Sequence, residues 1–165
     1  MVLFTAVFFP VAVLAGCFFA AVSFVGFGSR PPAEPVSIPY EDTSLPGFLL
    51  SPPDASGPLP TLIVNNGSDG PGSSTWTLLG APAVARGFRA LSFDGPGQQS
   101  ILFGRGVPFR PDWENVVTPV VDFLLARPDV DPRRIAPAGI SQAGYWVPRA
   151  LAFEYRIAAA VADPE

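Results

Sequence analysis

From residue 36 onward, short apolar runs alternate with longer stretches whose hydrophobic residues have helical spacing. The short runs are rich in β-branched residues and are bounded by Gly, Pro or Asn, which is typical of buried strands. They predict strands at residues 36–40, 47–51, 59–64, 88–93, 135–140 and 157–162.

The longer stretches predict three helices, at residues 74–86, 112–127 and 142–155. Asp112 is expected to cap the second helix, and Pro82 to make the middle of the first irregular. Strands that alternate with helices form a parallel sheet, whereas the first two strands are close enough to form an antiparallel hairpin. The sequence therefore predicts an α/β fold, with a hairpin followed by a mostly parallel, doubly wound sheet.

Residues 1–28 contain no charged side chain, and Arg30 is the first. A helix of that length would span about 42 Å, against roughly 30 Å for the hydrocarbon layer of a membrane. The segment is interpreted as a membrane anchor, an uncleaved signal, a lipoprotein leader with Cys17 as the lipidated residue, or a mis-started leader without a role. No basic residue precedes the apolar run, which argues against a signal peptide.

The expected organisation is therefore an apolar segment at 1–28, a Pro-rich linker at 29–35 and one α/β domain at 36–165. If the first segment is genuine, the protein is expected in a membrane or exported. If it is not, a cytoplasmic location is expected.

The composition excludes several kinds of chemistry. The chain has no His and a single Cys, and all ten of its basic residues are Arg. It cannot build a histidine metal site, an internal disulfide, a lysine Schiff base or a complete Ser-His-Asp triad from these residues. The net charge of −4, without a basic cluster, argues against nucleic acid as a partner. No metal and no cofactor are expected.

The most specific motif is GISQAG at residues 139–144, between a predicted strand and a predicted helix. A serine at such a sharp turn exposes its hydroxyl, and small neighbours are needed because strand and helix nearly touch there. Ser141 is therefore a candidate nucleophile. A helix-capping serine flanked by packing glycines is the alternative.

Two further loops follow predicted strands. In the first, NNGSDG at residues 65–70, a backbone amide could form half of an oxyanion hole, with the amide of Gln142 as the other half. The donor in this loop would be Ser68, or alternatively Asp69. An ordinary polar turn is the competing interpretation. The second, DGPGQQS at residues 94–100, indicates only a tight loop.

In this order, the motifs resemble the α/β-hydrolase superfamily, in particular the group of dipeptidyl aminopeptidase-like and acylaminoacyl-peptidase-like enzymes, with pseudooxynicotine-hydrolase-like esterases nearby. The resemblance implies that Ser141 is the nucleophile and that the amides of Ser68 and Gln142 are the oxyanion donors. The residues that carry it are 66–69, 93–98, 112–114, 131–135, 139–145 and 147–150.

The sequence departs from the family at several positions. Ala143 and Gln99 stand where the family usually has Gly, and Pro137 lies inside the strand that leads to the nucleophile. The family's acid and histidine follow the nucleophile in chain order. Asp163 comes one strand too early to be that acid and is expected to be a solvated carboxylate at a strand end.

The sequence thus predicts the N-terminal part of a serine hydrolase of ester or peptide bonds, with a small-molecule or peptide acyl substrate. Without a base, this chain alone is expected to have negligible turnover. The alternatives are a non-catalytic α/β module anchored to a membrane through residues 1–28 and a truncated gene product without a stable fold. The oligomeric state is left open.

Overall fold

The computed structural model describes residues 33–164. Six strands form one mixed sheet in the order β1-β2-β4-β3-β5-β6. The strands are β1 (Ala33–Tyr40), β2 (Thr43–Leu50), β3 (Leu59–Asn65), β4 (Arg89–Phe93), β5 (Val130–Ile140) and β6 (Val161–Asp163). The helices are α1 (Gly72–Thr75), the π-helical turn η2 (Trp76–Gly80), α2 (Ala81–Ala85), α3 (Gln99–Arg105), α4 (Glu114–Leu125) and α5 (Ala143–Leu151).

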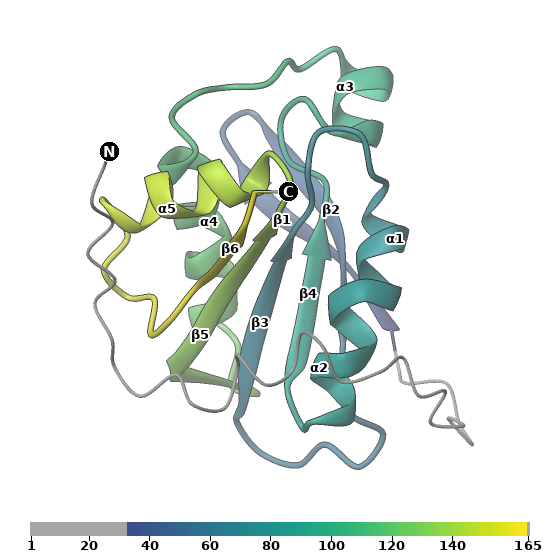
Figure 1. Cartoon of the computed structure of the whole chain (residues 1–165). Helices are drawn as coiled ribbons and strands as arrows, with labels where there is room; N and C mark the ends of the chain where they lie inside the picture. The colour runs from purple at the N-terminus through teal and green to yellow at the C-terminus, as the bar shows by residue number, and fades with distance from the viewer. Residues whose placement is uncertain (1–32, 165) are drawn as a thin grey trace.

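The sheet has an antiparallel part and a parallel part. β1 pairs antiparallel with β2, and β2 antiparallel with β4, whereas β4, β3, β5 and β6 run parallel to one another. The α/β fold class, with a hairpin before a parallel sheet, is thereby confirmed. The parallel strands all end at the same edge of the sheet, at the top of Figure 1, so the loops that follow β3, β4 and β5 meet there.

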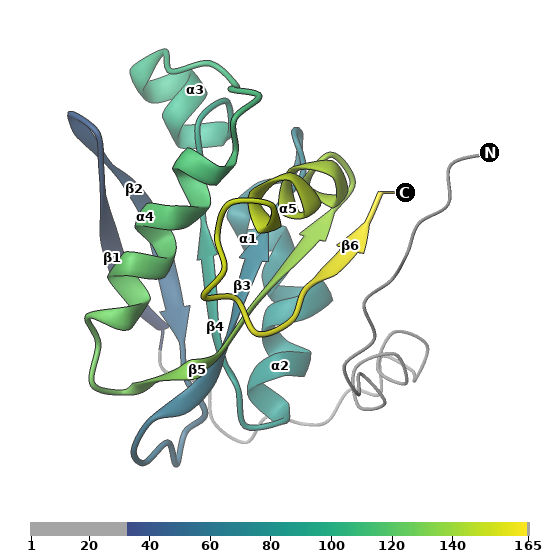
Figure 2. The same ribbon diagram turned by 90° about the vertical axis from the view of Figure 1, so that its left-hand side faces the viewer.

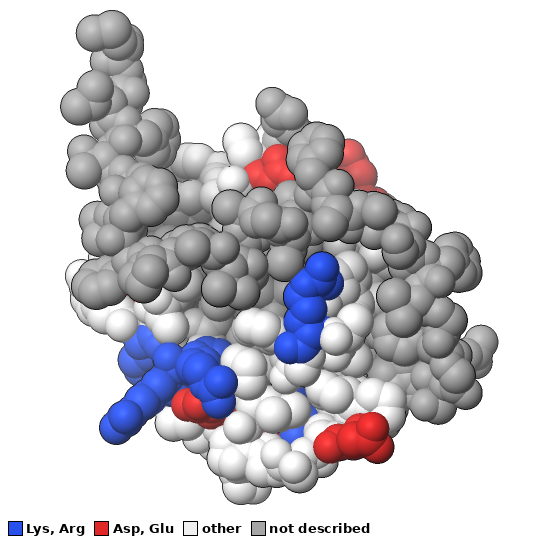
Figure 3. All heavy atoms as spheres, turned by 60° about the horizontal axis from the view of Figure 1, so that its bottom comes forward, with Lys and Arg blue, Asp and Glu red and all other residues white. Residues whose placement is uncertain are grey.

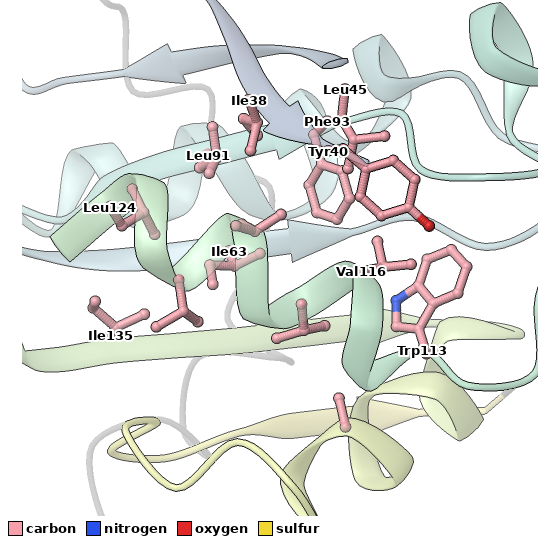
Figure 4. Close-up of a cluster of buried hydrophobic side chains, with 14 of the residues drawn as sticks. Ile38, Tyr40, Leu45, Ile63, Leu91, Phe93, Trp113, Val116, Leu124 and Ile135 are labelled. Carbon is pink, nitrogen blue, oxygen red and sulfur yellow. The ribbon is translucent and has the colours of Figure 1, made fainter. Parts of the chain in front are cut away.

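Helices cover both faces of the sheet. α4 and α5 lie on one face, and α1, η2 and α2 lie on the other (Figures 1 and 2). Figure 4 shows the larger core, where Ile63 and Leu91 of the central strands face Val116 and Leu124 of α4, with Trp113 at the start of that helix. All five side chains are buried, and their removal from water is the main favourable contribution to folding.

The first predicted helix is irregular in its middle, as expected. Pro82 has no N–H to donate within the helix, and just before it the Ala81 amide bonds to the carbonyl of Trp76, five residues back. This is the widened spacing of a π-turn. The helix ends before Gly87, which has a φ of +82° that favours glycine.

Several expectations about the elements need correction, and the first is β5, which begins at Val130 rather than at residue 135. β6 covers only 161–163 of the predicted 157–162 strand, and α5 ends at Leu151 rather than near residue 155. α3 was not predicted at all. The prediction that Asp112 caps α4 is wrong, because Trp113 occupies the N-cap position and the Asp112 carboxylate accepts hydrogen bonds from the side chains of Arg110 and Asn115.

Pro137 is accommodated in β5 by the direction of its backbone. The amide of Ala158 donates to the carbonyl of Ile135, so residues 135 and 137 turn their backbone groups toward the β6 side of the strand. Pairing with β6 begins only at Ala138. The missing N–H of Pro137 therefore breaks no hydrogen bond with β3.

The predictions for residues 1–28, including Cys17 as a lipidated residue, lie outside the described residues. Within 33–164, none of the helices combines the length and the apolar character that crossing a bilayer requires. β1 begins at Ala33, three residues before the strand expected from the sequence.

Candidate active site

Ser141 lies on the turn between β5 and α5 with a φ of +57°, in the left-handed region that residues other than glycine rarely adopt. The residue is exposed at the carboxyl edge of the sheet. The alternative of a capping serine does not fit this geometry, because Gln142 holds the N-cap position of α5 and no side chain caps the helix.

Glycines on both sides of Ser141 allow strand and helix to touch. A Cβ on Gly139 would lie 2.2 Å from the carbonyl oxygen of Ala143, and a Cβ on Gly144 would lie 2.7 Å from the backbone of Asp163. Neither position can hold a larger residue without movement of the backbone. Ala143, where the family usually has Gly, fits because its methyl group is fully buried in the larger core.

The backbone of the turn is bound to the neighbouring strand. The Ser141 amide donates to the carbonyl of Asp163 at 2.7 Å, and the Gly144 amide donates to the carbonyl of Ser141 at 2.8 Å. The Gln142 amide makes no hydrogen bond within residues 33–164. It is thus available to an anion at the start of α5, where the helix dipole also favours negative charge.

Asp163 is the last residue of β6 and is intermediate in exposure, and its carbonyl forms part of the frame around Ser141. The sheet thus uses the backbone of Asp163 to hold the nucleophile candidate in place.

The loop after β3 lies directly against Ser141. A Cβ on Gly67 would be 3.0 Å from the Cβ of Ser141 and 3.3 Å from its Oγ. The Gly67 amide donates to the Oδ1 of Asn66 at 2.9 Å and is therefore occupied. The Ser68 amide makes no hydrogen bond within the part of the chain that the structure describes. The structure thus places Gly67, the residue before Ser68, directly against Ser141.

Side chains that the sequence did not single out hold this loop. Gln98 is 1% exposed and donates to the carbonyls of Asn66, at 2.7 Å, and Gly67, at 2.8 Å. Trp113 donates from Nε1 to the Oδ1 of Asn65 at 2.7 Å. Both residues belong to motifs that carry the family resemblance, but their partners lie more than 30 positions away in sequence, so the pattern alone could not assign these contacts.

The loop after β4 is tight, as expected, and passes into α3. The Oδ2 of Asp94 accepts a hydrogen bond from the Oγ of Ser100 at 2.6 Å. Gln99, the other departure from the family pattern, donates from Nε2 to the carbonyl of Asp69 at 2.8 Å. This loop thus supports the β3 loop from the side and brings no nucleophile of its own.

Beneath the edge, α4 and α5 are joined by aromatic and charged contacts. The rings of Trp113 and Trp146 stack with centroids 4.0 Å apart. Arg149 binds both carboxylate oxygens of Glu114, at 3.0 and 2.9 Å, and these hydrogen bonds hold the pKa of Glu114 below its ordinary value. Trp146 and Arg149 belong to α5, the helix that follows Ser141, so these contacts fix the position of α5 against α4.

The opposite end of the parallel strands, which faces the viewer in Figure 3, shows several Arg side chains. A shallow depression there has apolar lining from Phe88 and Ala136, with Arg86 and Arg134 at its sides. Arg134 pairs with Asp131, and Arg86 donates to the carbonyl of Pro82. Among residues 33–164, no group of His, Cys, Asp and Glu side chains gathers in a way that could hold a metal ion.

Comparisons with known proteins find several curated hydrolases that resemble this chain. The chain is 36% identical over 140 residues to the hydrolyase ccsE of Aspergillus clavatus, an alignment that covers 78% of this chain and 32% of that protein. It is 39% identical over 140 residues to the alpha/beta hydrolase xenA of Xenoacremonium sinensis, covering 78% and 33%. No family model matches the sequence.

Among solved structures, the 2,6-dihydroxy-pseudo-oxynicotine hydrolase superposes with a TM-score of 0.72 at 25% identity, over 78% of this chain and 36% of that one. The acylaminoacyl peptidase of Pyrococcus horikoshii superposes with a TM-score of 0.60 at 16% identity, over 82% and 23%, which is a likeness of fold alone.

The mixed sheet, the strained serine after β5 and these relatives define the class of protein. The chain belongs to the α/β-hydrolase superfamily. It spans about a third of the length of the curated relatives that it matches.

Proposed function

We propose that this chain carries the nucleophile and the oxyanion donors of a serine hydrolase that acts on ester or peptide bonds. The observation that carries the proposal is the left-handed backbone of Ser141, on a turn that only glycines at 139 and 144 permit. A strained turn of this kind exposes a serine hydroxyl at the edge of the sheet. The relatives that are named hydrolases support the same conclusion.

In the proposed reaction, the Oγ of Ser141 attacks the acyl carbon and its proton passes to a base. The carbonyl oxygen becomes an oxyanion, which accepts hydrogen bonds from the amides of Ser68 and Gln142. The bond to the leaving group then breaks, and the leaving group takes the proton from the base. Water attacks the resulting acyl-serine in the same way, which releases the acid and restores Ser141.

The base is the part that these 165 residues do not provide, because they include no histidine. A serine hydroxyl without a base is a weak nucleophile at neutral pH. We therefore expect negligible turnover by the chain alone, and we expect imidazole in solution to support acylation of Ser141.

The test uses the full chain, kept in mild detergent, with p-nitrophenyl acetate and increasing imidazole. The expected result is a protein-dependent release of nitrophenol that rises with imidazole, and an acetyl group on Ser141 by mass spectrometry. Ser141→Ala should show only the reaction of imidazole itself. Ser74→Ala is the control, since Ser74 is exposed and only donates to the carbonyl of Pro71.

Equal rates for the chain and for Ser141→Ala, or an acetyl group on another residue, would contradict the proposal. Hydrolysis without imidazole that disappears in Ser141→Ala would keep Ser141 as nucleophile but would overturn the expectation that the chain alone is inactive.

A further inference from the structure

We infer that Gln98 is a positioning residue that sets the direction of the Ser68 amide, an inference that rests on the function proposed above. Gln98 comes directly before α3, and its side chain is almost completely buried. Within residues 33–164, its side-chain hydrogen bonds go to Asn66, Gly67 and Gly95 and not to Ser141. Its effect on the reaction would therefore pass through the loop after β3.

The hydrogen bonds of Gln98 join two loops. Its Nε2 donates to the carbonyls of Asn66 and Gly67, and its Oε1 accepts from the amide of Gly95 at 2.7 Å. The side-chain amide thus uses both of its N–H groups and its oxygen. Only this orientation of the amide matches two backbone acceptors and one backbone donor.

The bond to the Gly67 carbonyl is the one that reaches the oxyanion site. That carbonyl and the Ser68 N–H belong to the same planar, trans peptide unit, so they point in opposite directions. Holding the oxygen toward Gln98 therefore aims the Ser68 N–H away from Gln98. Because Gly67 lies against Ser141, this peptide unit is next to the candidate nucleophile.

Without Gln98, little else would fix this peptide. Gly67 has no side chain, and glycine backbone adopts many conformations at low cost. The peptide between Asn66 and Gly67 has two supports. Gln98 donates to its carbonyl, and its N–H donates to the Asn66 side chain. The peptide between Gly67 and Ser68 has no such second support within residues 33–164, so its orientation depends on Gln98 more than that of its neighbour does.

The experiment measures binding of phenylboronic acid to the full chain. The Ser141 Oγ forms a bond to boron, boron becomes tetrahedral and negatively charged, and one proton is released to the solvent. The anion then occupies the place of the oxyanion without any need for a base. Binding is followed by the boron-11 signal of the tetrahedral adduct, and the Ser68 amide by its nitrogen-15 and proton resonances.

Gln98→Met keeps the length of the side chain and removes its hydrogen bonds. We expect its affinity for the boronate to fall by roughly ten- to a hundredfold, which is part of the effect of removing an oxyanion donor. The shift of the Ser68 amide on binding, present in the unmodified chain, should be lost. In the imidazole-supported reaction, the rate of acylation should fall while the KM changes little.

Gln99→Met is the matched control, because Gln99 also donates to a carbonyl of the same loop, that of Asp69. Its boronate affinity should stay within about twofold, since that peptide does not contain the Ser68 amide.

Normal boronate binding by Gln98→Met, or an equal loss in Gln99→Met, would overturn the inference. If Gln98→Met does not melt cooperatively, Gln98→Glu replaces it. Its boronate affinity, relative to that of the unmodified chain at the same pH, should recover toward low pH, where a protonated carboxyl can donate to the Gly67 carbonyl. An affinity equal to that of the unmodified chain at every pH would overturn the inference. Tetrahedral binding that survives in Ser141→Ala would instead refute the proposed nucleophile.

Discussion

The two loops that meet at the candidate site are held by different means. The turn around Ser141 is fixed by backbone hydrogen bonds and by glycines that leave no space for a Cβ. The loop after β3 is fixed by side chains from elsewhere, above all Gln98 and Trp113. The nucleophile turn therefore depends on the close approach of backbone atoms, whereas the proposed oxyanion loop depends on polar side chains from distant positions in the sequence.

This difference also predicts how each loop fails. A steric constraint is violated as soon as one methyl group is added, because backbone atoms cannot move aside cheaply. A side-chain hydrogen bond can be removed while the surrounding packing is kept, and the cost is then that of an unpaired buried group. Substitutions in the serine turn should therefore lower the free energy of unfolding more than substitutions of the side chains that hold the loop after β3.

The largest effect is expected for Gly139→Ala. Its Cβ would lie 2.2 Å from the Ala143 carbonyl oxygen and 2.9 Å from Val147, so strand and helix must separate. We expect a loss of about 3 kcal/mol or more in the free energy of unfolding, measured with urea. Gly104→Ala is the control, because a Cβ there meets nothing within 4 Å. Similar urea midpoints of unfolding for Gly139→Ala and Gly104→Ala would show that the turn is not fixed by steric contacts.

A moderate effect is expected for Trp113→Phe. The change keeps an aromatic ring beside Trp146 but removes the donor to Asn65, whose side chain is completely buried. An unpaired buried acceptor costs about 1–3 kcal/mol in the free energy of unfolding. Trp76→Phe is the control in urea unfolding, since the Trp76 ring makes no hydrogen bond within residues 33–164. If the free energy of unfolding falls equally in the two variants, the hydrogen bond from Trp113 to Asn65 does not support the loop.

The smallest effect is expected far from both loops, at Glu154. This side chain is 4% exposed and binds Arg156, with an Nε to Oε1 distance of 2.7 Å, and this hydrogen bond holds the pKa of Glu154 below its ordinary value. A carboxyl group with a lowered pKa stabilises the fold above its unfolded pKa and loses this contribution as the pH falls through the folded value.

Glu154→Gln should therefore lower the melting temperature at pH 7 and flatten its decline toward about pH 3. Asp122→Asn is the control, because Asp122 binds the same arginine from an exposed position. A decline that is as steep in Glu154→Gln as in the unmodified chain would mean that this pair does not cause the sensitivity to acid.

The sequence could predict the sheet and the serine turn because their determinants are local. The apolar runs specify the strands, and the serine and the small residues of the turn all lie within 139–144. The role of Gln98 could not be predicted in this way, since its partners are 31 and 32 positions away. α3 was missed because it follows a Gly- and Pro-rich loop and has no capping side chain.

The error at Asp112 has a similar cause. Its position before an apolar helix is typical of a cap, but Arg110 competes for the carboxylate through two hydrogen bonds, at 2.8 and 2.9 Å. The hydrogen bonds with Arg110 also hold the pKa of Asp112 far below its ordinary value. Local rules thus failed where a charged neighbour offered a stronger partner.

The pairing of β3 with β5 has a consequence for the order in which the molecule folds. Leu59 pairs with Val130, so about 70 residues of chain must be brought into a closed loop before the strand that presents Ser141 can join the sheet. The hairpin of β1 and β2 closes over only a few residues. Because contacts between distant parts of a chain form slowly, we expect the edge that carries the nucleophile to assemble late, after the hairpin and α4 have formed.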